Sequence, residues 1–169
     1  MKNVFNSKKA QGTVYIGISI LLVSYAILFI ICYFVLSSFL TAISTSSYYT
    51  VDMEIAGNKF LGALQILDYV MVFMTIVLIV GVGLTTYRLA TPPIYFIINL
   101  VAGAFYGLFA YFMSYFFQQF ASNALFTATL LYFPRTVMIV SNLHWVFLAA
   151  LIVGSIALFG KKPRGQYIE

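Results

Sequence analysis

The feature that most constrains this chain is the length of its stretches without a charged residue. No Asp, Glu, Lys or Arg occurs between Lys9 and Asp52, between Arg88 and Arg135, or between Arg135 and Lys161. A helix needs roughly 20 mainly apolar residues to cross the hydrocarbon core of a bilayer, which is about 30 Å thick. Each stretch is long enough for such a helix. The chain is therefore predicted to be an integral membrane protein.

Composition excludes an ordinary soluble domain. Hydrophobic residues make up 63% of the chain, whereas about 45–50% is typical of a globular protein. No polar stretch is long enough to form a separate soluble lobe, so a single membrane domain is expected over residues 1–169. Because backbone groups in lipid must find hydrogen bonds within their own segment, the spans are predicted to be helical.

Four transmembrane helices are predicted. They cover approximately residues 13–43, 61–84, 94–117 and 140–159. Residues 44–60 are predicted to form the first loop, because they begin with a polar cluster and carry three charges. Pro92 and Pro93 fit the first turn of the third helix, where a missing N–H costs little.

The segment between the third and fourth spans, residues 118–139, is predicted to contain an additional short helix. Its apolar part covers residues 124–133, which is too short to span a bilayer, and Pro134 and Arg135 interrupt it. We expect this piece to lie flat at the interface or to be re-entrant. The predicted fold is an all-α integral membrane protein with four transmembrane helices and a short interfacial or re-entrant helix before the last span.

The distribution of basic residues predicts that both termini are cytoplasmic. Four spans place the termini on the same side, and only Lys59 and Arg135 then lie on the other side. The basic residues on the terminal side are Lys2, Lys8, Lys9, Arg88, Lys161, Lys162 and Arg164. This asymmetry follows the positive-inside rule, and basic residues at span ends also contact anionic headgroups. The net charge of +5 is therefore read as a topology signal, and direct nucleic-acid binding is not expected.

Asp68 is the only acidic residue inside a predicted span. An ionisable group in a membrane is a functional candidate, for example as a proton relay. The alternative is a structural role about two turns inside the second span. There the carboxylate can reach water, Lys59 or Arg135, or lie near a helix N-terminus whose partial positive charge favours an anion. We expect the structural role, with Asp68 as an intramembrane polar contact.

Gly103 and Gly107 form a G-x-x-x-G pattern in the third span. Small residues at this spacing let two helices approach closely in a membrane. We expect them to pack within the bundle, and contact with a second copy in a homo-oligomer is the alternative. Gly81 and Gly83 in the second span are interpreted in the same way.

Residue types that carry catalysis or bind metals are scarce. The chain has one histidine, His144, and one cysteine, Cys32. A metal site usually needs three or four ligands, so a single histidine cannot build one. His144 precedes Trp145 at a span end and is expected to contact headgroups. We expect no enzyme activity, no metal and no cofactor.

From the second span onward, the chain resembles a group of small multi-span membrane proteins. These proteins are encoded near the capsid genes of tailless icosahedral viruses with an internal lipid membrane, and similar reading frames occur in related integrated elements. The resemblance covers residues 66–162. It is carried by Ile66-Leu67-Asp68-Tyr69, Thr91-Pro92-Pro93-Ile94-Tyr95-Phe96-Ile97-Ile98, Ser114-Tyr115-Phe116-Phe117-Gln118-Gln119-Phe120, Phe133-Pro134, Asn142-Leu143-His144 and Gly160-Lys161. The chain departs from the pattern at Pro92 and Tyr115, where similar proteins tend to carry His and Asn.

The resemblance implies a structural protein of a virion internal membrane, which anchors or organises lipid beneath the capsid shell. It also implies that the protein resides in the host cytoplasmic membrane during assembly. The expected partners are the lipid bilayer and capsid or other membrane proteins. The candidate headgroup or capsid contacts are Lys8, Lys9, Arg88, Lys161, Lys162 and Arg164. Two alternatives stay open: a holin-like or pore-forming protein, and a small scaffolding subunit of a cellular membrane complex.

Overall fold

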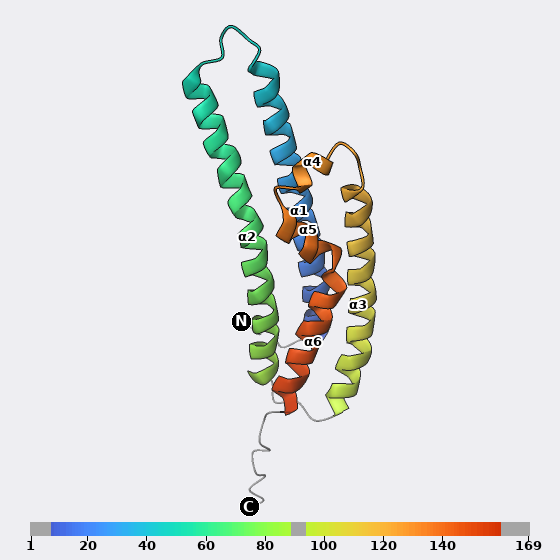
Figure 1. The fold of residues 1–169 in the computed structure, drawn as a ribbon. Helices are drawn as coiled ribbons and strands as arrows, with labels where there is room; N and C mark the ends of the chain where they lie inside the picture. Colours follow the sequence, from blue (N-terminus) through green and yellow to red (C-terminus); the bar gives the residue numbers. More distant parts are fainter. Residues whose placement is uncertain (1–7, 89–93, 160–169) are drawn as a thin grey trace, which may run out of the picture.

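The structure is a computed structural model that describes residues 8–88 and 94–159, with side chains over residues 16–84, 100–101 and 103–157. Every regular element in these ranges is an α-helix, which confirms the predicted all-α class (Figure 1). The helices are α1 (Lys8–Ile43), α2 (Val51–Arg88), α3 (Ile94–Ala121), α4 (Thr127–Leu130), α5 (Pro134–Ser141) and α6 (Leu143–Phe159).

Helices α1 and α2 form a long hairpin whose closed end extends beyond α3 and α4 (Figure 1). α1 ends at Ile43, where the first span was predicted to end. α2 begins at Val51, so the prediction of a loop over residues 44–60 is wrong from residue 51 onward. Asp52, Glu54 and Lys59 therefore lie on α2, which begins before its apolar stretch.

Local chemistry explains the early start of α2. The Oγ1 atom of Thr50 accepts the N–H of Met53 at 3.3 Å, which satisfies one of the free donors of the first turn. Asp52 and Glu54 lie in that turn, where the helix dipole favours negative side chains. The charges that suggested a loop therefore stabilise a helix N-terminus.

Two helical segments are long and apolar enough to cross a bilayer. They are Ile16–Ile43 within α1 and Val51–Leu84 within α2. α5 and α6 form a third such segment if they are taken as one bent span, because their axes differ by 69° across the break at Asn142. Among the residues that the structure describes, this criterion supports two spans, or three with the bent pair, and it does not establish the predicted four.

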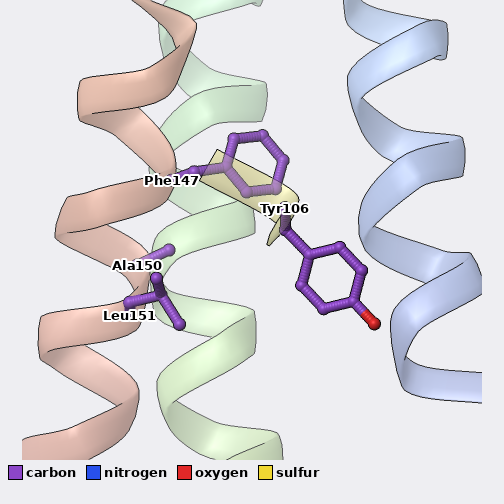
Figure 2. A pocket seen from close by; sticks show the side chains of 4 residues that line it. All are labelled: Tyr106, Phe147, Ala150 and Leu151. Atoms are coloured by element: carbon purple, nitrogen blue, oxygen red, sulfur yellow. The ribbon is translucent and has the colours of Figure 1, made fainter. Parts of the chain in front are cut away.

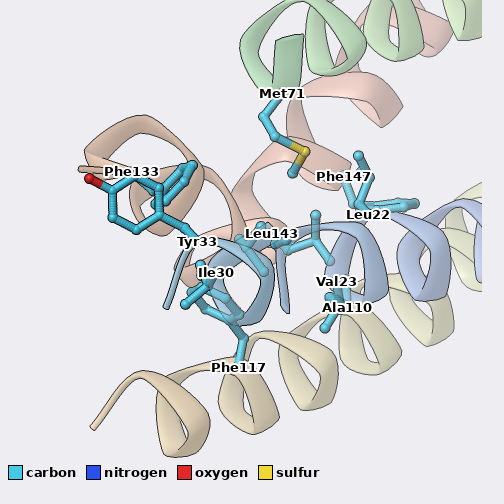
Figure 3. Packing of buried hydrophobic residues seen from close by; sticks show 12 residues of the cluster. Leu22, Val23, Ile30, Tyr33, Met71, Ala110, Phe117, Phe133, Leu143 and Phe147 are labelled. Carbon is cyan, nitrogen blue, oxygen red and sulfur yellow. The ribbon is translucent and has the colours of Figure 1, made fainter. Parts of the chain in front are cut away.

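The core lies where α1, α3, α5 and α6 meet, with one large contribution from α2 (Figure 3). Leu22, Ala26, Ile30 and Tyr33 recur at helical spacing and form the buried face of α1. The other helices add the buried side chains of Met71, Ala110, Phe117, Val140, Leu143 and Phe147. Because lipid is itself apolar, van der Waals packing and hydrogen bonds between helices hold such a core together.

Helix α6 packs against both α2 and α3, and glycines mark both contacts. A Cβ atom at Gly83 would lie 2.8 Å from a methyl carbon of Val153, and one at Gly103 would lie 2.7 Å from the methyl carbons of Leu151. Both glycines are buried. They let the backbones of α2 and α3 approach the side chains of α6.

Candidate functional site: a short helix clamped at both ends

The most specific polar arrangement in the described part of the chain surrounds α5. This helix has only eight residues and contacts α1, α2 and α3. A helix leaves its first N–H groups and its last C=O groups without partners inside the helix. Phe133, at the N-cap position, supplies no side-chain hydrogen bond. The partners of α5 therefore have to come from elsewhere.

The carboxylate of Asp68 on α2 supplies the partners at the N-terminus of α5. Its Oδ1 atom accepts the N–H of Thr136 at 2.6 Å, and its Oδ2 atom accepts the N–H of Arg135 at 3.3 Å. Pro134, the first residue of α5, has no N–H, and the N–H of Val137 reaches the carbonyl oxygen of Phe133 at 3.0 Å. The first-turn donors of α5 are thus all satisfied, two of them by one side chain of another helix.

The side chain of Arg135 adds the charge that balances Asp68. Its Nη1 atom lies 3.2 Å from Oδ2 of Asp68, and its guanidinium lies 4.0 Å from the centre of the Tyr69 ring. Asp68 is 1% exposed, whereas the Arg135 side chain is 45% exposed. An arginine stacked on an aromatic face and paired with a carboxylate is stabilised by both contacts. The buried charge is therefore paired, and its partner reaches the surface of the bundle.

Side chains of α3 satisfy the opposite end of α5. The hydroxyl of Ser114 donates to the carbonyl oxygen of Ser141, and Nε2 of Gln118 donates to the same oxygen at 3.0 Å. Ser114 and Gln118 are four residues apart, so they lie on one face of α3. A helix C-terminus carries partial negative charge and favours donors. α5 is therefore held at its positive end by an anion from α2 and at its negative end by donors from α3.

The contacts of Asp68 and Arg135 position α5 and leave no carboxylate oxygen of Asp68 open to a substrate. Both carboxylate oxygens of Asp68 already accept hydrogen bonds, and the residue is almost completely buried. The structure brings Asp68 together with Arg135 and with a helix N-terminus, two of the environments considered from the sequence. It does not bring Asp68 to Lys59, for which the structure records no ion pair within the described residues.

No protein family, no characterised protein and no solved structure in these comparisons matches the chain. What the molecule does must therefore be argued from the chain itself.

The structure separates the two glycines of the G-x-x-x-G pattern. Gly103 faces Leu151 on α6 within the bundle, whereas a Cβ atom at Gly107 would meet nothing within 4 Å. A Cβ atom at Gly81 would likewise meet nothing within 4 Å, whereas one at Gly83 would meet Val153 of α6. In each pair, an added Cβ would meet a side chain of α6 at one glycine only.

The predicted basic contacts can be placed only in part. Lys8 and Lys9 lie in the first turn of α1, and Arg88 is the last residue of α2. The side chains of these three residues, and the whole of Lys161, Lys162 and Arg164, lie outside the part of the chain that the structure describes.

The remaining candidates lie apart from α5. Cys32 is exposed on α1. His144, in the first turn of α6, contacts the rings of Tyr111 and Trp145, with centroids 5.7 Å and 5.4 Å away. Among the described residues, no group of three or more His, Cys, Asp or Glu side chains is placed to hold a metal ion.

A small cavity between α3 and α6 does not suit a ligand. It measures about 10 Å³ and is lined by Tyr106, Phe147, Ala150 and Leu151 (Figure 2). A water molecule needs at least roughly this volume together with two to four polar partners, and apolar cavities stay dry. The cavity is therefore a small gap in the packing of α3 and α6.

Sequence reasoning missed the partners at the C-terminal end of α5. The available signal was the pair Ser114 and Gln118, two polar side chains at i and i+4 near the end of an aromatic helix. Their spacing indicates a shared face, but nothing in the sequence indicates that Ser141 lies opposite that face.

Proposed function

We propose that this chain is a structural membrane protein, and that its place is the internal membrane of a tailless icosahedral virion, beneath the capsid shell. The first part rests on the helical bundle, and the second on the resemblance of residues 66–162. In this role the protein organises lipid and anchors other proteins to it.

One observation carries the structural role. The only buried acid among the described residues, Asp68, holds the N-terminus of α5 with both of its oxygens. A proton relay needs a carboxylate that exchanges its proton with water or a carrier group, and Asp68 is 1% exposed. The geometry therefore favours a fixed scaffold over proton transfer.

The outer surface of the bundle supports the membrane setting. Large apolar side chains on four different helices are more than half exposed, among them Leu28 on α1, Phe73 on α2, Phe105 on α3 and Ile156 on α6. Soluble monomers rarely expose contiguous apolar patches of more than a few hundred Å². Lipid chains are the natural cover for a surface of this kind.

We further propose that α1, α2, α3 and the bent pair α5–α6 form four spans with both termini cytoplasmic. α3 has 28 residues, so at about 1.5 Å per residue it is roughly 42 Å long, which exceeds the hydrocarbon thickness. In a virion assembled on the cytoplasmic face of the host membrane, the basic tails would then face the capsid. Lys161, Lys162 and Arg164 would meet anionic headgroups and acidic capsid surface.

Quantitative mass spectrometry of purified particles tests the virion assignment. After the capsid is stripped, the chain should remain with the lipid vesicle at a constant ratio to the capsid protein across preparations. A chain found only in host membranes would contradict the virion role and favour a cellular scaffold. Release of a trapped dye from vesicles that contain the purified chain alone would instead support the pore-forming alternative.

A further inference from the structure

A cleft of about 440 Å³ lies where α1 and α2 separate toward their connecting loop, and residues of α4 complete its lining. Its walls are mixed in polarity. Leu40 and Leu61 supply apolar surface, and hydroxyl, amide and carboxylate groups supply the rest. Tyr49 of the connecting loop lies at the same end, and tyrosines are enriched at the headgroup level of a bilayer. A cleft of this mixed polarity suits a lipid headgroup together with the start of its acyl chains.

Two polar stripes line the cleft, one from the end of α1 and one from the start of α2. One stripe is formed by Ser37 and Thr41 on α1 and by Ser44 directly after its last residue, at positions i, i+4 and i+7. On α2, Glu54 and Asn58 lie one turn apart. Residues at these spacings share one face of a helix, so each stripe points in a single direction.

The stripe on α1 offers acceptors rather than donors. The hydroxyl of Ser37 donates to the carbonyl oxygen of Phe34 at 3.0 Å, and that of Thr41 donates to the carbonyl oxygen of Ser37 at 2.9 Å. The hydroxyl of Ser44 donates to the carbonyl oxygen of Thr41 at 2.7 Å. A hydroxyl has one proton and two lone pairs, so these three oxygens keep only their acceptor sites for a ligand.

The charged group of the cleft, the Glu54 carboxylate, also favours a ligand that donates hydrogen bonds. An ionised carboxylate is acceptor-only, and Glu54 has no ion-pair partner among the residues that the structure describes. The hydroxyl oxygens of the α1 stripe and the Glu54 carboxylate therefore favour a ligand that donates hydrogen bonds and carries positive charge, next to the apolar walls.

We propose that this cleft binds a phospholipid whose headgroup ends in a primary ammonium, as in phosphatidylethanolamine. The three N–H groups of the ammonium donate to the Glu54 carboxylate and to hydroxyl oxygens of the α1 stripe. The glycerol and upper acyl carbons lie against Leu40 and Leu61. This inference goes beyond the proposed function, because it requires only that α1 and α2 lie in a bilayer.

Native mass spectrometry of the full chain, released from nanodiscs of stated lipid composition, tests this site. The probes are phosphatidylethanolamine, phosphatidylcholine and phosphatidylglycerol with identical acyl chains. Phosphatidylcholine keeps the positive charge but has no N–H, and phosphatidylglycerol has hydroxyls and a net negative charge. The wild-type protein should retain phosphatidylethanolamine about five- to tenfold better than either, the effect expected for one charge-assisted hydrogen bond.

Glu54→Gln should lower that retention to the level of phosphatidylcholine, and Asp52→Asn is the matched control. Asp52 carries the same charge in the same helical turn but does not line the cleft. Ser37→Ala removes one acceptor without disturbing the helix and should cause a smaller loss. Circular dichroism should show unchanged helix content in all three variants.

Three results would overturn the proposal. One is equal retention of the three lipids by the wild-type protein. Another is a loss with Asp52→Asn that matches the loss with Glu54→Gln, which would indicate a general charge effect. The third is a different occupant of the cleft. Free ethanolamine that binds as well as the lipid would show that the acyl chains contribute nothing. A dimer that excludes lipid and dissociates with Asn58→Leu would show that a second copy fills the cleft.

Discussion

At the scale of single residues, Asp68 is a buried acid whose partners come from another helix. Loss of its carboxylate would leave two N–H groups at the start of α5 without partners, and an unsatisfied donor in a bundle is costly. Asp68 accepts both of these N–H groups from a different helix, and it also pairs with Arg135. The position therefore combines a helix cap with an ion pair.

Substitution of Asp68 should separate these contributions. Asp68→Asn keeps one acceptor oxygen and should lower the free energy of unfolding by about 1–2 kcal/mol. Asp68→Leu removes every acceptor and should lower it by about 2–5 kcal/mol, because two N–H groups of α5 lose their partner. Steric trapping of the protein in bicelles measures the free energy of unfolding of both variants. An Asp68→Leu protein as stable as wild type would contradict the capping role of Asp68. An Asp68→Asn protein that is inserted normally but has lost its function would point to proton transfer.

The two glycines of α3 should respond differently to a larger side chain. At Gly103 a branched side chain meets Leu151, so Gly103→Ile should destabilise the protein by about 1–3 kcal/mol through overpacking. At Gly107 nothing lies within 4 Å, so Gly107→Ile should change stability by less than about 0.5 kcal/mol. If Gly107 instead contacts a second copy, Gly107→Ile should convert an oligomer to monomers in analytical ultracentrifugation, and stability should fall with it.

At the scale of elements, α5 depends on its neighbours for its existence. Eight residues are too few for an isolated helix, because nucleation is costly and few hydrogen bonds follow it. α2 supplies the anion at one end and α3 the donors at the other. The short helix α5 therefore connects the two long helices α2 and α3 through hydrogen bonds at its two ends.

Removal of the donors on α3 should loosen α5 selectively. Ser114→Ala combined with Gln118→Leu leaves the carbonyl oxygen of Ser141 without its two partners. Hydrogen exchange of residues 134–141 should become roughly thirtyfold faster, since two hydrogen bonds worth about 1 kcal/mol each are lost. Exchange in the middle of α1 should stay unchanged and serves as the control. Equal acceleration in both segments would mean that the bundle unfolds as one unit and that α5 has no local clamp.

At the scale of the whole molecule, the number of spans decides where the termini lie. Four spans put both termini on the cytoplasmic side, whereas three put them on opposite sides. Single cysteines at Phe5, Ile55, Ser122 and Tyr167, in a Cys32→Ser background, test this with a membrane-impermeant thiol reagent. We expect Phe5→Cys and Tyr167→Cys to react from the cytoplasm, and Ile55→Cys and Ser122→Cys from the opposite side. Reaction of the two terminal cysteines from opposite sides would refute the four-span arrangement.

The sequence by itself determined the apolar, all-helical character of the chain. This follows from properties that act locally: charge-free length and the need of backbone groups for partners in lipid. The predicted interruption at Pro134 and Arg135 is wrong, because Pro134 begins α5 and the break before α6 falls at Asn142. The start of α2 was missed because charges at a span end were read as a loop, although they also suit a helix N-terminus.

Only the tertiary structure decided which partners the polar side chains meet. Asp68 and Arg135 are 67 positions apart, and their contact depends on how α5 packs against α2. From the sequence alone, Lys59, Arg135 and a helix N-terminus were equivalent partners for the carboxylate. The cleft between α1 and α2 likewise exists only because the two helices separate toward their loop. Helical spacing determines which residues share a face, and the packing of whole helices determines what lies opposite that face.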